Sequence, residues 1–139
     1  MINLDQYRIA TIAKDFTFAA AHRLNGLPEG HPCERNHGHN YTVRVSFTGY
    51  INDVGFVIDY RELDWLSQRI DAELDHRHLN DVMDTNPTAE HIAELLLRWV
   101  VEWVEATTDQ HRVLRVEVGV SETPKTWATV AADARGRVH

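Results

Sequence analysis

The chain has 139 residues, 43% hydrophobic and 25% charged, which predicts one ordinary globular domain over residues 1–139. Its net charge of −7, without a basic run, argues against a nucleic-acid partner. One cysteine cannot form an internal disulfide, and no apolar run reaches the length of a membrane span, so we expect a cytoplasmic protein with no membrane partner.

Two stretches in the first third of the chain alternate between apolar and polar residues, as β-strands do. Residues 9–22 predict a strand whose apolar face ends at His22. Residues 24–36 are rich in glycine, proline and asparagine and predict a loop. The alternation returns over residues 37–47, which predict a second strand.

A turn and a helix are expected next. Residues 49–55 predict a turn, so that residues 56–59 form the returning strand of a hairpin. Asp59 and Glu62 then resemble a capping box at the start of a helix. The apolar stripe of this helix consists of Leu63, Leu66, Ile70 and Leu74.

A second helix begins near Pro87 or Thr88, since both residue types suit the first turn. Its apolar stripe consists of Ile92, Leu95, Leu96, Trp99 and Trp103. Two late strands are predicted, over residues 114–122 and about 127–131. The whole order predicts an α+β domain, with two helices packed on one face of an antiparallel sheet.

Three histidines stand out as candidate metal ligands. His37 and His39 alternate with a glycine, so on a strand both imidazoles project to one side, with Cα atoms roughly 7 Å apart. His22 ends the other strand on its own apolar face and can supply a third nitrogen. Three neutral imidazoles with an open fourth position are typical of a catalytic zinc site. The alternative is a chance pattern in a chain with nine histidines.

Cys33 has two possible functions. It is either the fourth ligand of a closed, structural zinc site, or a base or nucleophile beside an open one, where its thiol pKa would be lowered. Asp75 and His76 can form an acid–base pair in which the carboxylate fixes the imidazole tautomer. From the residues alone a polar helix end is the first interpretation of this pair, and His78 is a rival for either role.

Glu122 ends the apolar face of the first late strand. A carboxylate in this position is either a solvated strand end or an anchor for a ligand. The ligand it suits has an amidine-like N–H edge, such as that of a pterin or a guanine.

Six motifs occur in the order found in the 6-pyruvoyl tetrahydropterin synthase family, which the chain resembles from about Lys14 to Glu122. They are FTFAAAHRL, PEGHPCERNHGHNY, GFVIDYREL, LDHRHLND, NPTAEHIA and SETP. The resemblance implies the T-fold, or tunnelling fold, of that family.

The resemblance also implies a role for each candidate residue. The zinc ligands are His22, His37 and His39. The catalytic residues are Cys33, Asp75 and His76, with Asp75 and His76 forming a proton relay that excludes His78. The pterin contacts are Glu122 and Thr88.

Three residues separate Cys33 from His37, which favours the branch of this family that forms 6-carboxytetrahydropterin. The branch implies a Zn²⁺-dependent lyase that converts 7,8-dihydroneopterin triphosphate to 6-carboxy-5,6,7,8-tetrahydropterin, acetaldehyde and triphosphate, in 7-deazapurine (queuosine-type) biosynthesis. It also implies a homohexamer of two trimers with sites at subunit interfaces. Three alternatives stay open: the pyruvoyl-forming branch, a dihydroneopterin aldolase-like activity, and a non-catalytic zinc-binding module with Cys33 as fourth ligand.

Overall fold

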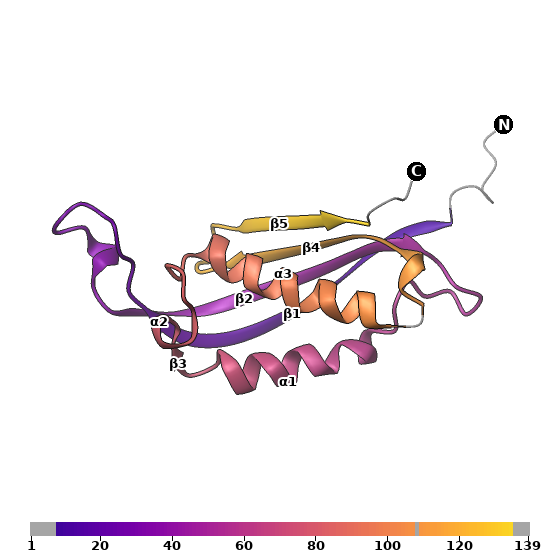
Figure 1. Cartoon of the computed structure of the whole chain (residues 1–139), viewed down its shortest axis with the longest axis horizontal. Helices are drawn as coiled ribbons and strands as arrows, with labels where there is room; N and C mark the ends of the chain where they lie inside the picture. Colours follow the sequence, from indigo (N-terminus) through magenta and orange to yellow (C-terminus); the bar gives the residue numbers. More distant parts are fainter. Residues whose placement is uncertain (1–7, 108, 135–139) are drawn as a thin grey trace.

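Two long antiparallel strands form the centre of the sheet (Figure 1). In a computed structural model of the chain, which describes residues 8–107 and 109–134, β1 spans Ile9–His22 and β2 spans His37–Tyr50. Their register runs from Ile9 opposite Tyr50 to His22 opposite His37. Two of the three candidate ligands are therefore cross-strand neighbours, at the end of the sheet where the loop between the strands begins.

The sheet has five strands in the order β3-β1-β2-β4-β5. β4 (Val113–Ser121) pairs antiparallel with β2, and β5 (Ala128–Asp133) pairs antiparallel with β4. β3 (Arg77–His78) lies parallel to β1. The sheet is therefore mixed, and the prediction of an antiparallel sheet is wrong at this edge, where two residues pair with the outer side of β1.

Helices α1 (Asp64–Glu73) and α3 (Ala89–Ala106) cover one face of the sheet, as predicted (Figure 1). The stripe predicted for the first helix is buried throughout, and Ile92, Leu96 and Trp99 are buried from the second. Thr88 caps α3, because its Oγ1 accepts a hydrogen bond from the His91 N–H at 3.1 Å. No helix within the described ranges is long and apolar enough to cross a membrane.

The predicted alternation of β2 is confirmed. Tyr41, Val43, Val45 and Phe47 point toward the helices and are fully buried. The other face of the sheet is polar, and there Arg44 pairs with Asp15 of β1 at 2.8 Å. The metal-ligand candidates share the buried, helix-covered face, since His22, His37 and His39 have the same parity as the core residues.

The prediction of a hairpin strand over residues 56–59 is wrong. Both edges of β2 are already paired, one with β1 and the other with β4, so no edge is available to it. The chain turns here instead, because the Asn52 side chain accepts hydrogen bonds from the N–H groups of Val54, Gly55 and Phe56. Asp59 caps a 3₁₀ turn, Tyr60–Leu63, that leads into α1.

Two short elements were not predicted from the sequence. They are β3 and α2 (Leu79–Val82), which lie between the two long helices. Neither is long enough to show a hydrophobic period. They form through tertiary contacts with β1, and they place Asn80 next to the loop that follows His22.

Candidate metal centre and adjoining cavity

His22, His37 and His39 form a compact cluster at the end of β1 and β2. Each offers one ring nitrogen, and these nitrogens all lie within 4.8 Å of one another. His22 is fully buried, and the other two side chains are partly buried. The three residues predicted as metal ligands are therefore brought together by the strand register.

Backbone carbonyls fix the orientation of two of these rings. His22 Nδ1 lies 2.7 Å from the Pro87 carbonyl oxygen, and His37 Nδ1 lies 2.7 Å from that of Arg35. A carbonyl only accepts hydrogen bonds, so each Nδ1 carries the proton and each Nε2 presents a lone pair. The two Nε2 atoms are 2.8 Å apart. Two lone pairs this close require a cation between them or a proton on one of them.

The third ring adds an unpaired nitrogen. His39 Nε2 is buried and has no hydrogen-bond partner in the part of the chain that the structure describes. Buried polar atoms are nearly always paired, so this nitrogen fits the role of a metal ligand. Burial also lowers the pKa of His22 below its ordinary value, which favours the neutral form that binds metals. Three neutral imidazoles suit Zn²⁺ with an open fourth position.

Tyr41 belongs to the same centre, although its role was missed in the sequence. Its ring stacks on Phe18, with centroids 4.8 Å apart, and its hydroxyl lies 3.2 Å from His22 Nδ1. Burial, together with the charge of Glu122, raises the pKa of this phenol, so that it stays protonated. The available signal was its place two residues after His39, on the same face of β2.

A small cavity of about 240 Å³ adjoins the cluster, and we call it the Thr88–Glu122 cavity. It is lined by Leu24, Thr88, Ala89, Glu90, Val120, Glu122, Thr126, Trp127 and Ala128. Glu122 Oε2 lies 3.9 Å from His39 Nε2, and Thr88 directly follows Pro87, which holds His22. The two predicted pterin contacts therefore share one cavity next to the histidines.

Asp75 and His76 form a hydrogen-bonded pair on the other side of β1. His76 Nδ1 lies 2.8 Å from Asp75 Oδ2, and the Ala19 N–H donates to Asp75 Oδ1 at 2.9 Å. The adjacent side chains meet because His76 has a left-handed backbone, with φ of 57°. The hydrogen bond from Ala19 is the larger cause, and that from His76 the next, of a pKa of Asp75 below its ordinary value. His78 bonds to Asn36 instead, at 3.1 Å.

Among the described residues, neither this pair nor Cys33 is hydrogen-bonded to the histidine cluster, although His76 and His39 line one pocket beside β3. The His76 side chain is 82% exposed, and no hydrogen bond or ion pair of the described residues joins it to a clustered histidine. Cys33 is a free thiol in the loop between β1 and β2, in the 3₁₀ turn Pro32–Glu34. The group of mutually close ligand atoms found among the described residues does not include it.

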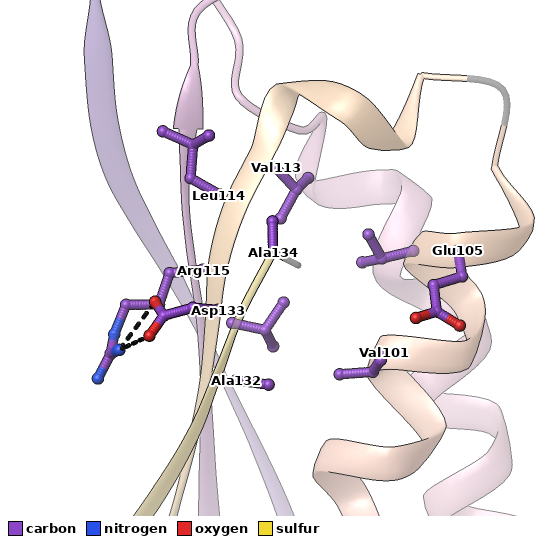
Figure 2. Close-up of a pocket in the computed structure, with 10 residues that line it drawn as sticks. Val101, Glu105, Val113, Leu114, Arg115, Ala132, Asp133 and Ala134 are labelled. Atoms are coloured by element: carbon purple, nitrogen blue, oxygen red, sulfur yellow. Dashed lines mark hydrogen bonds and ion pairs between the residues drawn. The ribbon is translucent and has the colours of Figure 1, made fainter. Parts of the chain in front are cut away.

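Another pocket lies between α3 and the far ends of β4 and β5 (Figure 2). Its walls are largely apolar, and Arg115 pairs with Asp133 at its rim at 3.0 Å. The apolar lining consists of Val101, Val104, Val113, Leu114, Val116, Ala132 and Ala134. None of the predicted site residues lines this pocket, so its location does not favour it as the reaction site.

Comparisons with known proteins agree with the motifs. Residues 11–133 match the model of the family described as 6-pyruvoyl tetrahydropterin synthase. The chain is 31% identical over 122 residues to 6-carboxy-5,6,7,8-tetrahydropterin synthase of Bacillus subtilis, covering 82% of this chain and 80% of that protein. It is 43% identical over 60 residues to dihydroneopterin monophosphate aldolase of Pyrococcus furiosus, covering 43% of this chain and 51% of that one.

Solved structures show the same architecture. The 6-pyruvoyl tetrahydropterin synthase of Caenorhabditis elegans superposes with a TM-score of 0.72 at 25% identity, covering 90% of this chain and 96% of that one. The predicted T-fold is thereby confirmed. The family match spans nearly all the described residues, from β1 to the end of β5. The chain therefore belongs to the 6-pyruvoyl tetrahydropterin synthase family.

Proposed function

We propose that this chain is a zinc-dependent 6-carboxytetrahydropterin synthase acting on 7,8-dihydroneopterin triphosphate. One observation carries the proposal: a cluster of three imidazoles adjoins a cavity whose wall holds a carboxylate, with Glu122 3.9 Å from His39. Relatives named as 6-carboxy-5,6,7,8-tetrahydropterin synthases and the short spacing between Cys33 and His37 support this branch.

Glu122 and Thr88 would bind the pterin ring. An ionised carboxylate accepts two parallel hydrogen bonds from the amino group and adjacent ring N–H of a pterin. Thr88 Oγ1 already accepts the His91 N–H, so its own O–H is available as a donor to a ring heteroatom. Because Glu122 lies beside His39, a ring held there would direct its side chain toward the histidine cluster.

The histidine cluster would hold Zn²⁺, which when bound supplies Lewis-acid chemistry that acidifies hydroxyl groups and polarises a carbonyl. Asp75 fixes His76 with its Nδ1 protonated, so that Nε2 can accept and return a proton. Cys33 serves as the second proton-transfer group. The reaction consumes water and releases triphosphate and acetaldehyde. It needs no external redox cofactor, because reduction of the ring balances oxidation of the carbon that becomes the carboxylate.

We propose that a complete site forms between chains of a homohexamer. Neither Cys33 nor the Asp75–His76 pair belongs to the group of close ligand atoms within one chain, although His76 and His39 line one pocket. The Thr88–Glu122 cavity, at about 240 Å³, is also below the roughly 300 Å³ at which complete ligand pockets begin. A neighbouring subunit of this chain would supply the missing groups and enclose the substrate.

Product analysis tests the proposal. The zinc-loaded protein is mixed with 7,8-dihydroneopterin triphosphate, aldehydes are trapped, and the products are identified by mass spectrometry. We expect 6-carboxytetrahydropterin and acetaldehyde in equal amounts. A pyruvoyl product without acetaldehyde would instead assign the chain to the pyruvoyl-forming branch, and absence of turnover by folded, zinc-loaded protein would support the non-catalytic zinc module.

An aldolase-type activity is the second candidate, favoured by the 43% identity to the Pyrococcus furiosus aldolase over 60 residues. The same experiment separates the two activities, because an aldolase releases glycolaldehyde. We place the synthase first because the synthase match extends over 82% of this chain and the aldolase match over 43%.

If the synthase proposal is correct, its product would enter 7-deazapurine (queuosine-type) biosynthesis, and deleting the gene would deplete 7-deazaguanine nucleosides in tRNA.

A further inference from the structure

The short segment Arg23–Asn25, between His22 and the Cys33 loop, is held by two asparagine side chains. The Arg23 N–H donates to Asn80 Oδ1 at 2.8 Å, and Asn80 Nδ2 donates to the Arg23 carbonyl at 2.8 Å. The Asn25 N–H donates to Asn86 Oδ1 at 2.9 Å, and Asn86 Nδ2 donates to the Asn25 carbonyl at 3.0 Å. We call these four hydrogen bonds the carboxamide clamp.

The two asparagine side chains hydrogen-bond to the backbone of this segment in the way that a neighbouring β-strand would. A carboxamide presents one acceptor and one donor side by side, as a strand residue does with its carbonyl and N–H. In an extended chain, residues two apart direct their backbone groups to the same edge. Asn80 and Asn86 occupy that edge at positions 23 and 25, while the Leu24 N–H points the opposite way and donates to the Cys33 carbonyl at 3.0 Å.

Hydrogen bonds are the main restraint on this loop. None of residues 23–36 is buried, so the loop contributes no core contact that would fix its position. Cys33 is tied directly to the middle residue of the clamped segment, and Arg23 Nε donates to the carbonyl of the adjacent Glu34 at 3.0 Å. Releasing the segment would therefore release the thiol.

Both asparagines stand on anchored backbone beside the metal centre. Asn86 immediately precedes Pro87, whose carbonyl accepts a hydrogen bond from His22. The carbonyl of Asn86 itself accepts a hydrogen bond from His91 Nδ1 at 2.6 Å. Asn80 lies in α2, next to the buried Leu79. The clamp thus connects the backbone that orients a metal-ligand histidine with the backbone that carries Cys33.

We propose that Asn80 and Asn86 are positioning residues, which hold the Cys33 thiol in the place required for proton transfer. The inference rests on the proposed role of Cys33 in the reaction. It assigns a function to the asparagines of the LDHRHLND and NPTAEHIA motifs, which do not line the Thr88–Glu122 cavity.

Alkylation of Cys33 tests the clamp without any assay of turnover. Cys33 is the only cysteine, so the rate of reaction with iodoacetamide reports on this thiol alone. The test variants are Asn80→Ala and Asn86→Ala. The matched control is Asn52→Ala, because Asn52 also holds a loop by accepting three backbone N–H groups, at the opposite end of β2.

In the zinc-loaded protein, we expect each clamp variant to raise the alkylation rate about 10-fold, the order expected for losing one or two hydrogen bonds. Zinc content should equal that of the wild type, and kcat should fall with little change in KM. The Asn52→Ala control should leave the alkylation rate and kcat unchanged. If the alanine variants do not fold, Asn80→Asp keeps the side-chain size but loses the donor, and it should also raise the rate.

Alkylation rates of folded clamp variants equal to those of wild type and Asn52→Ala would overturn the inference. A raised alkylation rate with unchanged kcat would also overturn it, because the thiol would then be displaced without consequence for turnover. If the wild type itself does not turn over the pterin triphosphate, the proposed function fails. The alkylation comparison would still decide whether the clamp holds Cys33.

Discussion

His22 and His37 face each other with their Nε2 atoms 2.8 Å apart, while the Nδ1 atom of each lies against a backbone carbonyl. This arrangement is unfavourable for two neutral imidazoles unless something positive lies between them. Removing metal should therefore destabilise the protein. At a free zinc concentration 1,000 times the Kd, binding adds about 4 kcal/mol to the free energy of unfolding.

We expect this increment to raise Tm by about 10 °C. Differential scanning calorimetry of chelator-treated protein, before and after adding Zn²⁺, measures the difference. Mg²⁺ is the control, because it prefers oxygen ligands and should have no effect. An equal Tm with and without zinc would contradict the metal site.

The stability of the metal-free protein should depend on pH through His22. Burial lowers the pKa of His22 below its ordinary value of 6.5. As the pH falls below 6.5, the unfolded chain binds a proton at this imidazole and the folded chain does not. The free energy of unfolding therefore falls with pH until the lowered pKa is reached, and then this contribution levels off.

Urea denaturation of metal-free protein at pH 7.5, 6.5 and 5.5 measures the slope of the free energy of unfolding against pH. His22→Gln should flatten it, whereas His111→Gln, at a side chain 74% exposed and 3.9 Å from Asp109, should change it little, because exposed ion pairs contribute little to stability. Equal slopes for wild type and His22→Gln would show that burial of His22 does not govern the acid response.

Cys33→Ala should separate the catalytic interpretation from the structural one. The three histidines form the close ligand group without Cys33, so the variant should bind one zinc per chain as the wild type does. Losing a proton-transfer group should lower kcat by about 10²- to 10⁴-fold. Metal analysis of purified protein and turnover assays measure both quantities. Loss of zinc with the thiol would identify Cys33 as a fourth ligand.

Mixed oligomers test whether the site draws on two chains. Cys33→Ala and His76→Ala should each be inactive alone. If Cys33 and His76 of one site come from different subunits, random mixing at equal ratio restores about a quarter of the sites. Co-expression of two differently tagged variants provides the mixture, and activity measured on the doubly purified complex decides. A mixture as inactive as its components would place both groups on one chain.

Much of the fold could be predicted from local patterns. β1 occupies the predicted residues 9–22, and Thr88 caps α3 where the sequence suggested a helix start. The His-Gly-His alternation also indicated that His37 and His39 share a face. These features depend on side-chain period and capping chemistry, which neighbouring residues determine.

Other features depend on tertiary contacts that no local pattern shows. Residues 56–59 have an apolar composition suited to a strand, but β1 and β4 already occupy both edges of β2. The Asp75–His76 pair depends on a left-handed backbone at His76. This backbone is held by a hydrogen bond of 2.6 Å from the His76 N–H to the Ala19 carbonyl. Tyr41 continues the face of β2 that carries His39, but the pattern alone does not distinguish it from a core residue, and its contact with His22 identifies its role.

Anomalous diffraction at the zinc edge, from a crystal grown with a pterin, tests the central claim most directly. The account predicts one zinc peak bounded by Nε2 of His22, His37 and His39, with the pterin ring hydrogen-bonded to Glu122 in the Thr88–Glu122 cavity. No zinc at the histidines, or a pterin bound away from Glu122, would contradict it.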